Sequence, residues 1–200
     1  MKSSNNFPLR LLFWESTAGC NLECIHCRRL DISKTLMKDD LSLDQVKTMI
    51  KDLASFSNAI FVISGGEPLI RPDIFEIAQN ANDLGLRVAL ASNGTMIDGS
   101  IAKKIKEAGV KRVSISIDGA TPEVHDRFRG IPGSYEKAIQ GIKNLQAIGV
   151  PVQLNATVAS HNVDTVEEIY KNALELKVQA LHFFMLVPVG CGVEISKGHQ

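Results

Sequence analysis

Cys20-Asn21-Leu22-Glu23-Cys24-Ile25-His26-Cys27 is the stretch around which we expect the chain to fold, because it holds three of the four cysteines. It follows an apolar segment, residues 9–15, whose composition is typical of a β-strand. Cysteine thiolates are the usual protein ligands of iron–sulfur clusters. Three thiolates at this C-x3-C-x2-C spacing can bind three irons of a cubic cluster. The fourth iron then lacks a protein ligand and is open to a substrate or cofactor.

Three other interpretations of these cysteines stay open, although the sequence favours the cluster over each of them. Positions i, i+4 and i+7 share a helix face, so the thiols could form a buried apolar stripe, but the polar Asn21 and Glu23 argue against a core helix. Zinc needs four ligands, and because the adjacent His26 and Cys27 rarely reach one metal, Cys191 would have to complete the site. A disulfide framework is expected in secreted proteins, and the sequence does not resemble one.

Length and charge restrict the classes of protein that we consider. A chain of 200 residues is the size of one domain, which buries roughly 70% of the surface of the unfolded chain. Lys plus Arg and Asp plus Glu both number 22, so there is no basic field to attract a nucleic acid. No apolar run approaches the ~18 residues of a membrane span, and no signal peptide is recognisable. We therefore predict a soluble, cytoplasmic protein without a nucleic-acid or membrane partner.

Strand-like and helix-like segments alternate from residue 9 onward, with short joins between them. This rhythm predicts an α/β fold in which right-handed crossovers join parallel strands. A capping box formed by Ser42 and Gln45 marks the start of the first helix. The predicted strands cover residues 9–15, 59–64, 87–92, 111–117, 152–158 and 180–186, and the later helices cover about 72–85, 98–108, 134–148 and 162–176.

Two of the predicted strands alternate polar with apolar residues. Because side chains alternate across a strand, the polar residues of each share one face. If helices cover the apolar outside, this face lines the inside of a curled sheet, where an ordinary closed barrel is apolar, and it indicates a polar ligand. The alternative is the exposed face of an open antiparallel sheet. The polar residues are Ser114, Ser116 and Asp118 in one strand and Gln153, Asn155 and Thr157 in the other.

Two further loops follow strands and are therefore expected at the carboxyl edge of the sheet, where α/β folds place their sites. The first is Ser64-Gly65-Gly66-Glu67-Pro68, whose paired glycines let the backbone approach a ligand that any Cβ would block. The second is Ser92-Asn93-Gly94, a turn with polar side chains that can face the same cleft. Each loop alone is an ordinary turn.

Taken together, the cysteine spacing and these loops resemble the signature of the radical S-adenosylmethionine (SAM) enzymes, over nearly all of residues 9–190. The resemblance implies a partial (β/α)6 barrel with a [4Fe-4S] cluster on Cys20, Cys24 and Cys27. In that family the open iron chelates the amino and carboxylate groups of SAM. An external one-electron donor reduces the cluster, and cleavage of SAM yields a 5′-deoxyadenosyl radical.

The resemblance also implies which residues bind SAM. Gly65, Gly66 and Glu67 resemble the segment that hydrogen-bonds the SAM amino group, and Ser92 and Asn93 resemble the loop on the ribose side.

The remaining implied positions come from the second half of the chain. Ser116 and Asp118 resemble positions near the ribose and the carboxylate, with Arg127 or Arg129 as a charge partner of that carboxylate. The positions that resemble those facing adenosine and adenine are Asn155, Thr157, Leu186 and Val187, and His26 stands where many members have an aromatic residue.

Three segments resemble, more narrowly, the radical SAM enzymes that edit tetrapyrrole side chains. They are residues 9–15, 24–29 and 185–192. The similarity implies a tetrapyrrole substrate and, most closely, removal of acetate groups from 12,18-didecarboxysiroheme in siroheme-dependent heme biosynthesis. Arginines expected on the cleft side could pair with substrate carboxylates, or could be surface charges: Arg28, Arg29, Arg71, Arg127 and Arg129. A peptide-modifying maturase and a non-catalytic cluster- or zinc-binding module are the alternatives.

We expect three parts in the chain: a tail (1–8), the partial barrel (9–190) and the start of a further extension (191–200). Enzymes with similar openings carry a sixth helix and a cysteine-rich extension, so we expect the chain to be a fragment. By this reasoning Cys191 is either an inert thiol or a ligand of an auxiliary [4Fe-4S] cluster.

Overall fold

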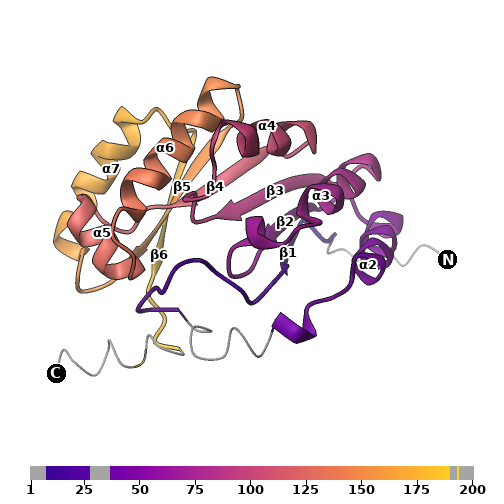
Figure 1. Ribbon diagram of the computed structural model, residues 1–200, viewed down its shortest axis with the longest axis horizontal. Coiled ribbons are helices and arrows are strands. Elements are labelled where there is room, and N and C mark those ends of the chain that lie inside the picture. Colours follow the sequence, from indigo (N-terminus) through magenta and orange to yellow (C-terminus); the bar gives the residue numbers. More distant parts are fainter. Residues whose placement is uncertain (1–7, 28–36, 190–192, 194–200) are drawn as a thin grey trace.

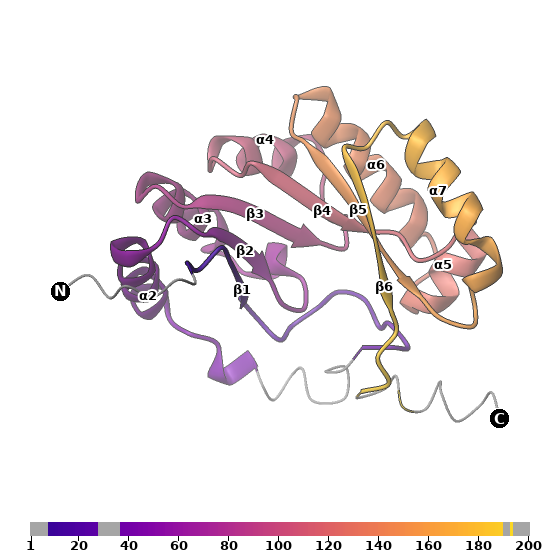
Figure 2. The same cartoon turned by 180° about the vertical axis from the view of Figure 1, so that it is seen from behind.

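The computed structural model describes residues 8–27, 37–189 and 193. One sheet of six parallel strands forms its centre, and the spatial order of the strands is their order in the sequence. The sheet curls into a half-barrel with helices on one side only (Figure 1, Figure 2). The predicted α/β fold is thereby confirmed. The strands are β1 (Leu11–Glu15), β2 (Ile60–Ser64), β3 (Arg87–Ser92), β4 (Arg112–Ser116), β5 (Val152–Val158) and β6 (Ala180–Met185).

The helices lie along the convex side of the sheet, and the predicted strands and helices agree with the observed bounds to within a few residues. No helix of the described part is both long and apolar enough to cross a membrane. The helices are α2 (Leu43–Phe56), α3 (Ile74–Asp83), α4 (Gly99–Glu107), α5 (Pro122–Arg129), α6 (Ser134–Ala147) and α7 (Val166–Glu175), with short 3-10 turns at Met37–Asp39, Pro68–Ile70 and Val163–Thr165.

The start of α2 shows the predicted capping box. The hydroxyl of Ser42 accepts a hydrogen bond from the backbone N–H of Gln45, and the side chain of Gln45 accepts one from the backbone N–H of Ser42. Each bond satisfies an N–H group that the first turn of a helix otherwise leaves without a partner.

Helix α5, between β4 and α6, was not predicted. It has eight residues, and most of them are polar, so no apolar periodicity marks it. Local signals are nevertheless present, because Pro122 occupies the first turn and Gly130 ends the helix in the left-handed conformation. A crossover of this length therefore contains two helices, α5 and α6, where one was expected.

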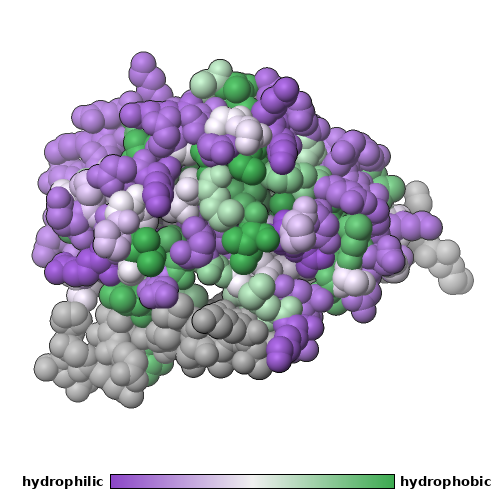
Figure 3. Space-filling view, in the orientation of Figure 1, coloured by the Kyte–Doolittle hydropathy of each residue, from purple (hydrophilic) through white to green (hydrophobic). Residues whose placement is uncertain are grey.

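The core lies between the sheet and the helices. Ile115 of β4, Leu154 of β5, and Ile142 of α6 are each at most 1% exposed. Burying a side chain of this size contributes about 1.5–3 kcal/mol. On the outside of these helices, hydrophilic residues cover most of the surface, with a hydrophobic strip near the centre of the view (Figure 3).

The concave side of the sheet is divided between polar and apolar side chains. By register, the inward residues of β4 and β5 are polar, as predicted, and they include Ser114, Ser116, Gln153 and Asn155. The inward residues of β1 and β2 are instead apolar, namely Leu11, Phe13, Ile60 and Val62, except at the carboxyl ends of the two strands, where Glu15 and Ser64 point inward. The expectation of a polar interior therefore holds for one half of the concave side.

Residues 16–27, here called the cysteine loop, run from the end of β1 across the carboxyl edge of the sheet to α5 (Figure 2). The backbone N–H of Ile25 donates to the carbonyl of Phe128 at 3.0 Å, and that of Glu23 donates to the carbonyl of Arg129 at 3.2 Å. The last turn of α5 therefore fixes the position of the cysteine loop.

We expect Gly130→Ala to loosen this attachment. Gly130 has a φ of 77°, and a Cβ there would overlap the backbone carbonyl of Glu23. The left-handed conformation costs a non-glycine residue roughly 1–2 kcal/mol, and the overlap adds to it. Urea denaturation should show a free energy of unfolding lower by about 2–4 kcal/mol.

Gly133→Ala is the matched control, because Gly133 also has a φ of 77° but an added Cβ would meet nothing within 4 Å. Its free energy of unfolding should fall only by the conformational cost of roughly 1–2 kcal/mol. Equal losses in the two variants would show that close contact with the cysteine loop contributes nothing.

Candidate functional site

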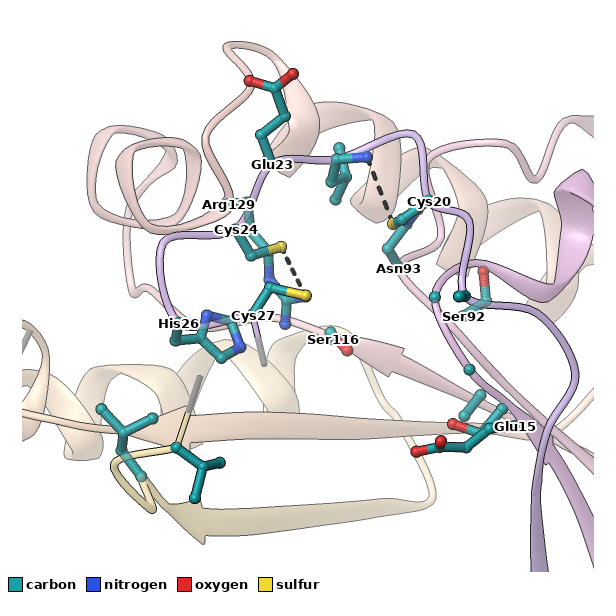
Figure 4. A pocket seen from close by; sticks show the side chains of 18 of the residues that line it. Glu15, Cys20, Glu23, Cys24, His26, Cys27, Ser92, Asn93, Ser116 and Arg129 are labelled. Carbon is teal, nitrogen blue, oxygen red and sulfur yellow. Dashed lines mark hydrogen bonds between the residues drawn. The ribbon is translucent and has the colours of Figure 1, made fainter. Parts of the chain in front are cut away.

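A cavity of about 700 Å³ opens at the carboxyl edge of the sheet (Figure 4). Its wall combines residues from the cysteine loop, from the loops after β2 and β3, from β4, from α5 and from the segment after β6. The sequence-predicted residues that it brings together are Cys20, Cys24, Cys27, Gly65, Gly66, Ser92, Asn93, Ser116, Arg129, Leu186 and Val187.

Five predicted residues do not line this cavity. Glu67 and Asp118 are fully buried behind its wall, and Arg127 is exposed on α5. Asn155 and Thr157 are half-buried on β5. Of the two arginines proposed as carboxylate partners, only Arg129 is therefore on the wall.

Sequence reasoning also missed part of the wall. Glu15, Ser64 and Ala91 line the cavity because each points inward near the carboxyl end of its strand. The same alternation that identified Ser116 could have found them. Glu23 lines it as well, but its position depends on the contact with α5, which no local pattern indicated.

The three thiols are turned toward one another across the cavity (Figure 4), and all three are free. Cys20 is exposed, Cys27 is half-buried and Cys24 is 8% exposed. Burial raises the pKa of the Cys24 thiol, although the nearby Arg129 works in the opposite direction. A metal that binds here would have to displace the proton, since the thiolate is the ligand.

Gly65 and Gly66 bring the loop after β2 against the cysteine loop. The N–H of Gly66 donates to the carbonyl of Thr17 at 2.7 Å, and the N–H of Glu67 donates to that of Gly19 at 2.8 Å. A Cβ on Gly66 would overlap the carbonyl of Gly19. The glycines are thus needed for contact between two loops, in addition to the close approach to a ligand predicted from the sequence.

Glu67 turns its carboxylate inward and ties the loop after β3 to its own loop. Its oxygens accept hydrogen bonds from the N–H of Leu69 at 3.1 Å, the hydroxyl of Ser92 at 2.9 Å and the N–H of Asn93 at 2.7 Å. Complete burial raises the pKa of Glu67 to about 7, against the lowering effect of these donors. The Glu67 side chain therefore supports the cavity wall from behind.

Asn93 connects this wall to the cysteine loop. Its amide nitrogen donates to the side-chain oxygen of Asn21 at 2.8 Å and lies 3.8 Å from the sulfur of Cys20. Its amide oxygen accepts from the N–H and the hydroxyl of Thr95 at 2.9 and 2.7 Å. The amide is thus fixed at both ends and holds the first cysteine in place.

Arg129 and Asp118 form a buried ion pair beside Cys24. A nitrogen of Arg129 lies 3.7 Å from the sulfur of Cys24. The carboxylate of Asp118 also accepts a hydrogen bond from the N–H of Thr157 at 2.6 Å. Burial opposes ionisation of Asp118, but Arg129 and this N–H together hold the pKa of Asp118 below its ordinary value.

His26 belongs to a stack of three rings at the end of the cysteine loop. Its ring lies 4.2 Å from that of Phe128, which lies 3.9 Å from that of His161 on its other face. Burial lowers the pKa of His26 to about 4, with a further contribution from Arg129, so the ring is neutral near pH 7. The ring of His26, which stands where many members of the resembled family have an aromatic residue, is therefore packed against Phe128 of α5.

Arg71, one of the arginines expected to face substrate, is engaged elsewhere. Its guanidinium donates to the backbone carbonyls of Ser16 and Leu41 and binds the carboxylate of Asp73. Arg28 and Arg29 lie outside the described residues.

The donor set consists of three thiols, the usual protein ligands of an iron–sulfur cluster. Within residues 8–27, 37–189 and 193, no three His, Cys, Asp or Glu side chains converge closely enough to hold one ion. Cys191, which the zinc alternative requires, lies outside the described residues.

The wall also has unused hydrogen-bonding capacity. His26 Nδ1 and Arg129 Nε are buried nitrogens that find no hydrogen-bond partner in the described part of the chain. A buried polar group without a partner costs about 1–3 kcal/mol, so such groups at a cavity wall favour a bound ligand.

Residues 14–185 match the family model described as the Radical SAM superfamily. The chain belongs to the radical SAM superfamily. The matched residues include the end of β1, the cysteine loop and strands β2 to β6, so the resemblance found in the sequence is confirmed at the level of the superfamily.

Two curated relatives come from Methanosarcina barkeri (strain Fusaro / DSM 804), and AdoMet in the name of the first is another abbreviation of SAM. The AdoMet-dependent heme synthase is 46% identical over 194 residues, which are 97% of this chain and 55% of the relative. The Fe-coproporphyrin III synthase is 38% identical over 184 residues, which are 91% of this chain and 45% of the relative. The chain spans about half the length of these curated relatives.

A solved structure, native anSMEcpe with bound AdoMet and Cp18Cys peptide, has the same fold. It is 25% identical with a TM-score of 0.73, and the match covers 90% of this chain and 52% of that one. This likeness supports the half-barrel as a domain of the radical SAM type.

We expect the buried carboxyl of Glu67 to make stability depend on pH. The carboxyl has a pKa of about 7 in the folded chain and about 4.3 in the unfolded chain. Its contribution to the free energy of unfolding is therefore fully present below a pH of about 4.3. It is lost as the pH rises through 7, by a total of about 4 kcal/mol. Glu67→Gln removes this titration, so urea denaturation between pH 4.5 and 8 should show a flatter profile than the parent chain.

Glu168→Gln, an exposed change on α7, controls for the loss of a carboxylate. Parallel stability profiles for the parent chain and Glu67→Gln would contradict the assigned pKa.

Proposed function

We propose that this chain binds a [4Fe-4S] cluster through Cys20, Cys24 and Cys27 and binds SAM beside it, as part of an enzyme that modifies a tetrapyrrole. The observation that carries the proposal is the convergence of the three thiols on one cavity of about 700 Å³. Membership of the radical SAM superfamily supports the choice of cluster and cofactor.

When bound, the cluster and SAM would supply a carbon radical that abstracts hydrogen from the substrate, after an external donor provides one electron. The residues of the chain have other tasks. The backbone of Gly65 and Gly66 and the hydroxyl of Ser116 offer polar contacts on the wall, and Leu186 and Val187 offer apolar ones. Placed around a bound SAM, these groups would orient it and exclude water, which protects a reactive intermediate from side reactions.

The proposed substrate class rests on the names of the two relatives and on exposed aromatic side chains of the concave side. The printed names of both relatives refer to heme or a porphyrin. Phe13 on β1 is 64% exposed and Phe184 on β6 is 51% exposed, and both point inward by register. Exposed apolar side chains in a concave surface favour a ligand with a large apolar face, such as a planar macrocycle.

Within this class we propose deacetylation of 12,18-didecarboxysiroheme as the reaction to test first. The proposal comes from the sequence resemblance, and the names of the relatives support the substrate class without specifying which side chain is altered. A peptide substrate is the second candidate, because the solved relative anSMEcpe holds a peptide together with AdoMet.

An auxiliary cluster in a further domain stays a prediction. Cys191, its first candidate ligand, lies outside the described residues, as do residues 190–192 and 194–200. The division into a tail, a partial barrel and the start of an extension is proposed on the same sequence grounds.

We expect Cys24→Ala to abolish both cluster binding and SAM cleavage. Loss of one of three ligands opens the cluster to solvent and to loss of iron. After anaerobic reconstitution, iron content and the electron paramagnetic resonance of the reduced cluster should fall to background. Release of 5′-deoxyadenosine in the presence of dithionite should fall with them.

Cys191→Ala separates the cluster from the zinc alternative. A three-cysteine cluster should survive this change, whereas a zinc site that needs Cys191 as its fourth ligand should be lost. Stoichiometric zinc and no iron in the parent chain would contradict the proposal.

Product analysis should separate the two substrate classes. With 12,18-didecarboxysiroheme, SAM and dithionite, mass spectrometry should detect loss of acetate groups that depends on Cys24. Unchanged didecarboxysiroheme in a preparation that cleaves SAM would overturn the deacetylase assignment, and modification of a peptide instead would favour the second candidate.

A further inference from the structure

Arg129 is the one arginine or lysine side chain among the described residues that line the cavity. It is 9% exposed and belongs to the last turn of α5, whose backbone also holds the cysteine loop. His26, the other basic residue on the wall, stacks its ring on that of Phe128. A single buried cation therefore faces the space between the thiols.

The orientation of Arg129 is fixed by its contacts. One terminal nitrogen lies 3.7 Å from the sulfur of Cys24, and the other pairs with the carboxylate of Asp118. Asp118 is itself held by the N–H of Thr157 at 2.6 Å, and its own N–H donates to His125 Nδ1 at 3.1 Å. Asp118, which is hydrogen-bonded to Thr157 of β5, thus holds the guanidinium in the orientation in which it points at the Cys24 thiol.

We infer that Arg129 positions the Cys24 thiolate and raises the reduction potential of the cluster. This inference rests on the proposed function, because it needs a cluster on the three thiols. Reduction adds one electron to the cluster and makes it more negative. A nearby buried cation stabilises that added charge, and hydrogen bonds to the ligand sulfurs act in the same direction. Residues that contact metal ligands in this way commonly tune the metal.

Asp118 opposes this effect while it holds Arg129 in place. Its carboxylate is fully buried and pairs with the same guanidinium. If the negative charge of Asp118 alone is removed, less of the positive potential of Arg129 at Cys24 is cancelled, and the reduced cluster should be stabilised further. Changes at the two residues should therefore shift the reduction potential of the cluster in opposite directions. A merely structural role for the pair does not predict opposite shifts.

This role differs from the one that the resemblance implied for Arg129, a partner of the SAM carboxylate. Both terminal nitrogens are already directed at Cys24 and Asp118. Only Nε is buried without a hydrogen-bond partner in the described part of the chain. Measuring the cluster in the absence of SAM separates the two roles.

The test is a redox titration of the reconstituted, SAM-free protein, followed by electron paramagnetic resonance. Arg129→Gln should shift the midpoint potential to more negative values. At the parent midpoint, the ratio of reduced to oxidised cluster should fall about tenfold, which corresponds to about 59 mV for one electron. Asp118→Asn should shift the midpoint to more positive values.

Two further variants keep the test decisive if a single change prevents folding, and a third, at an exposed residue, is the control. Arg129→Lys keeps the charge but cannot span both partners, so its midpoint should lie between those of the parent and Arg129→Gln. The double variant Asp118→Asn/Arg129→Gln removes both buried charges and should lie between the two single changes. Arg112→Gln removes an exposed cation at the amino end of β4 and should leave the midpoint unchanged.

The outcomes distinguish the inference from the proposed function. If the parent chain binds no cluster, the proposed function fails. If the parent and all variants bind the cluster with one common midpoint, or if the Arg129 and Asp118 variants shift it in the same direction, the proposed function stands and the inference is overturned.

Discussion

Backbone contacts on two sides of the cysteine loop are the constraint on which the site depends. On one side, the loop after β2 donates from Gly66 to Thr17 and from Glu67 to Gly19. On the other, the loop itself donates from Ile25 to Phe128 in α5. Because both anchors use main-chain groups, they fix the path of the loop independently of its side chains. The three thiols can then face one cavity without any bond between them.

Behind the cavity wall, the buried polar side chains are joined to one another by hydrogen bonds and an ion pair. Glu67 joins the loops after β2 and β3, and Asn93 joins the loop after β3 to the cysteine loop. Asp118 joins Arg129 to β5. Buried polar networks are costly unless every member is satisfied, so their concentration behind one cavity is expected where geometry must be held closely. The carboxyl ends of successive strands therefore bring together the polar groups whose interactions hold the thiols in place.

Much of this could be predicted from the sequence, because it depends on local patterns. Apolar runs and capping residues such as Ser42 located the strands and helices, and the order of the loops placed Cys20, Gly66, Asn93 and Ser116 at one edge. The role of Glu67 could not be predicted, since the direction of its side chain depends on a loop 25 residues away. Helix α5 was missed because its sequence is short and polar, although it decides where the cysteine loop ends.

The central claim is that three thiols hold a cluster whose fourth iron is open to SAM. Mössbauer spectroscopy of the protein reconstituted with iron-57, recorded with and without SAM, tests this claim most directly. The account predicts a [4Fe-4S] spectrum in which one iron of the four changes its parameters when SAM is added. A spectrum of isolated iron sites, or a cluster whose irons are all unaffected by SAM, would contradict it.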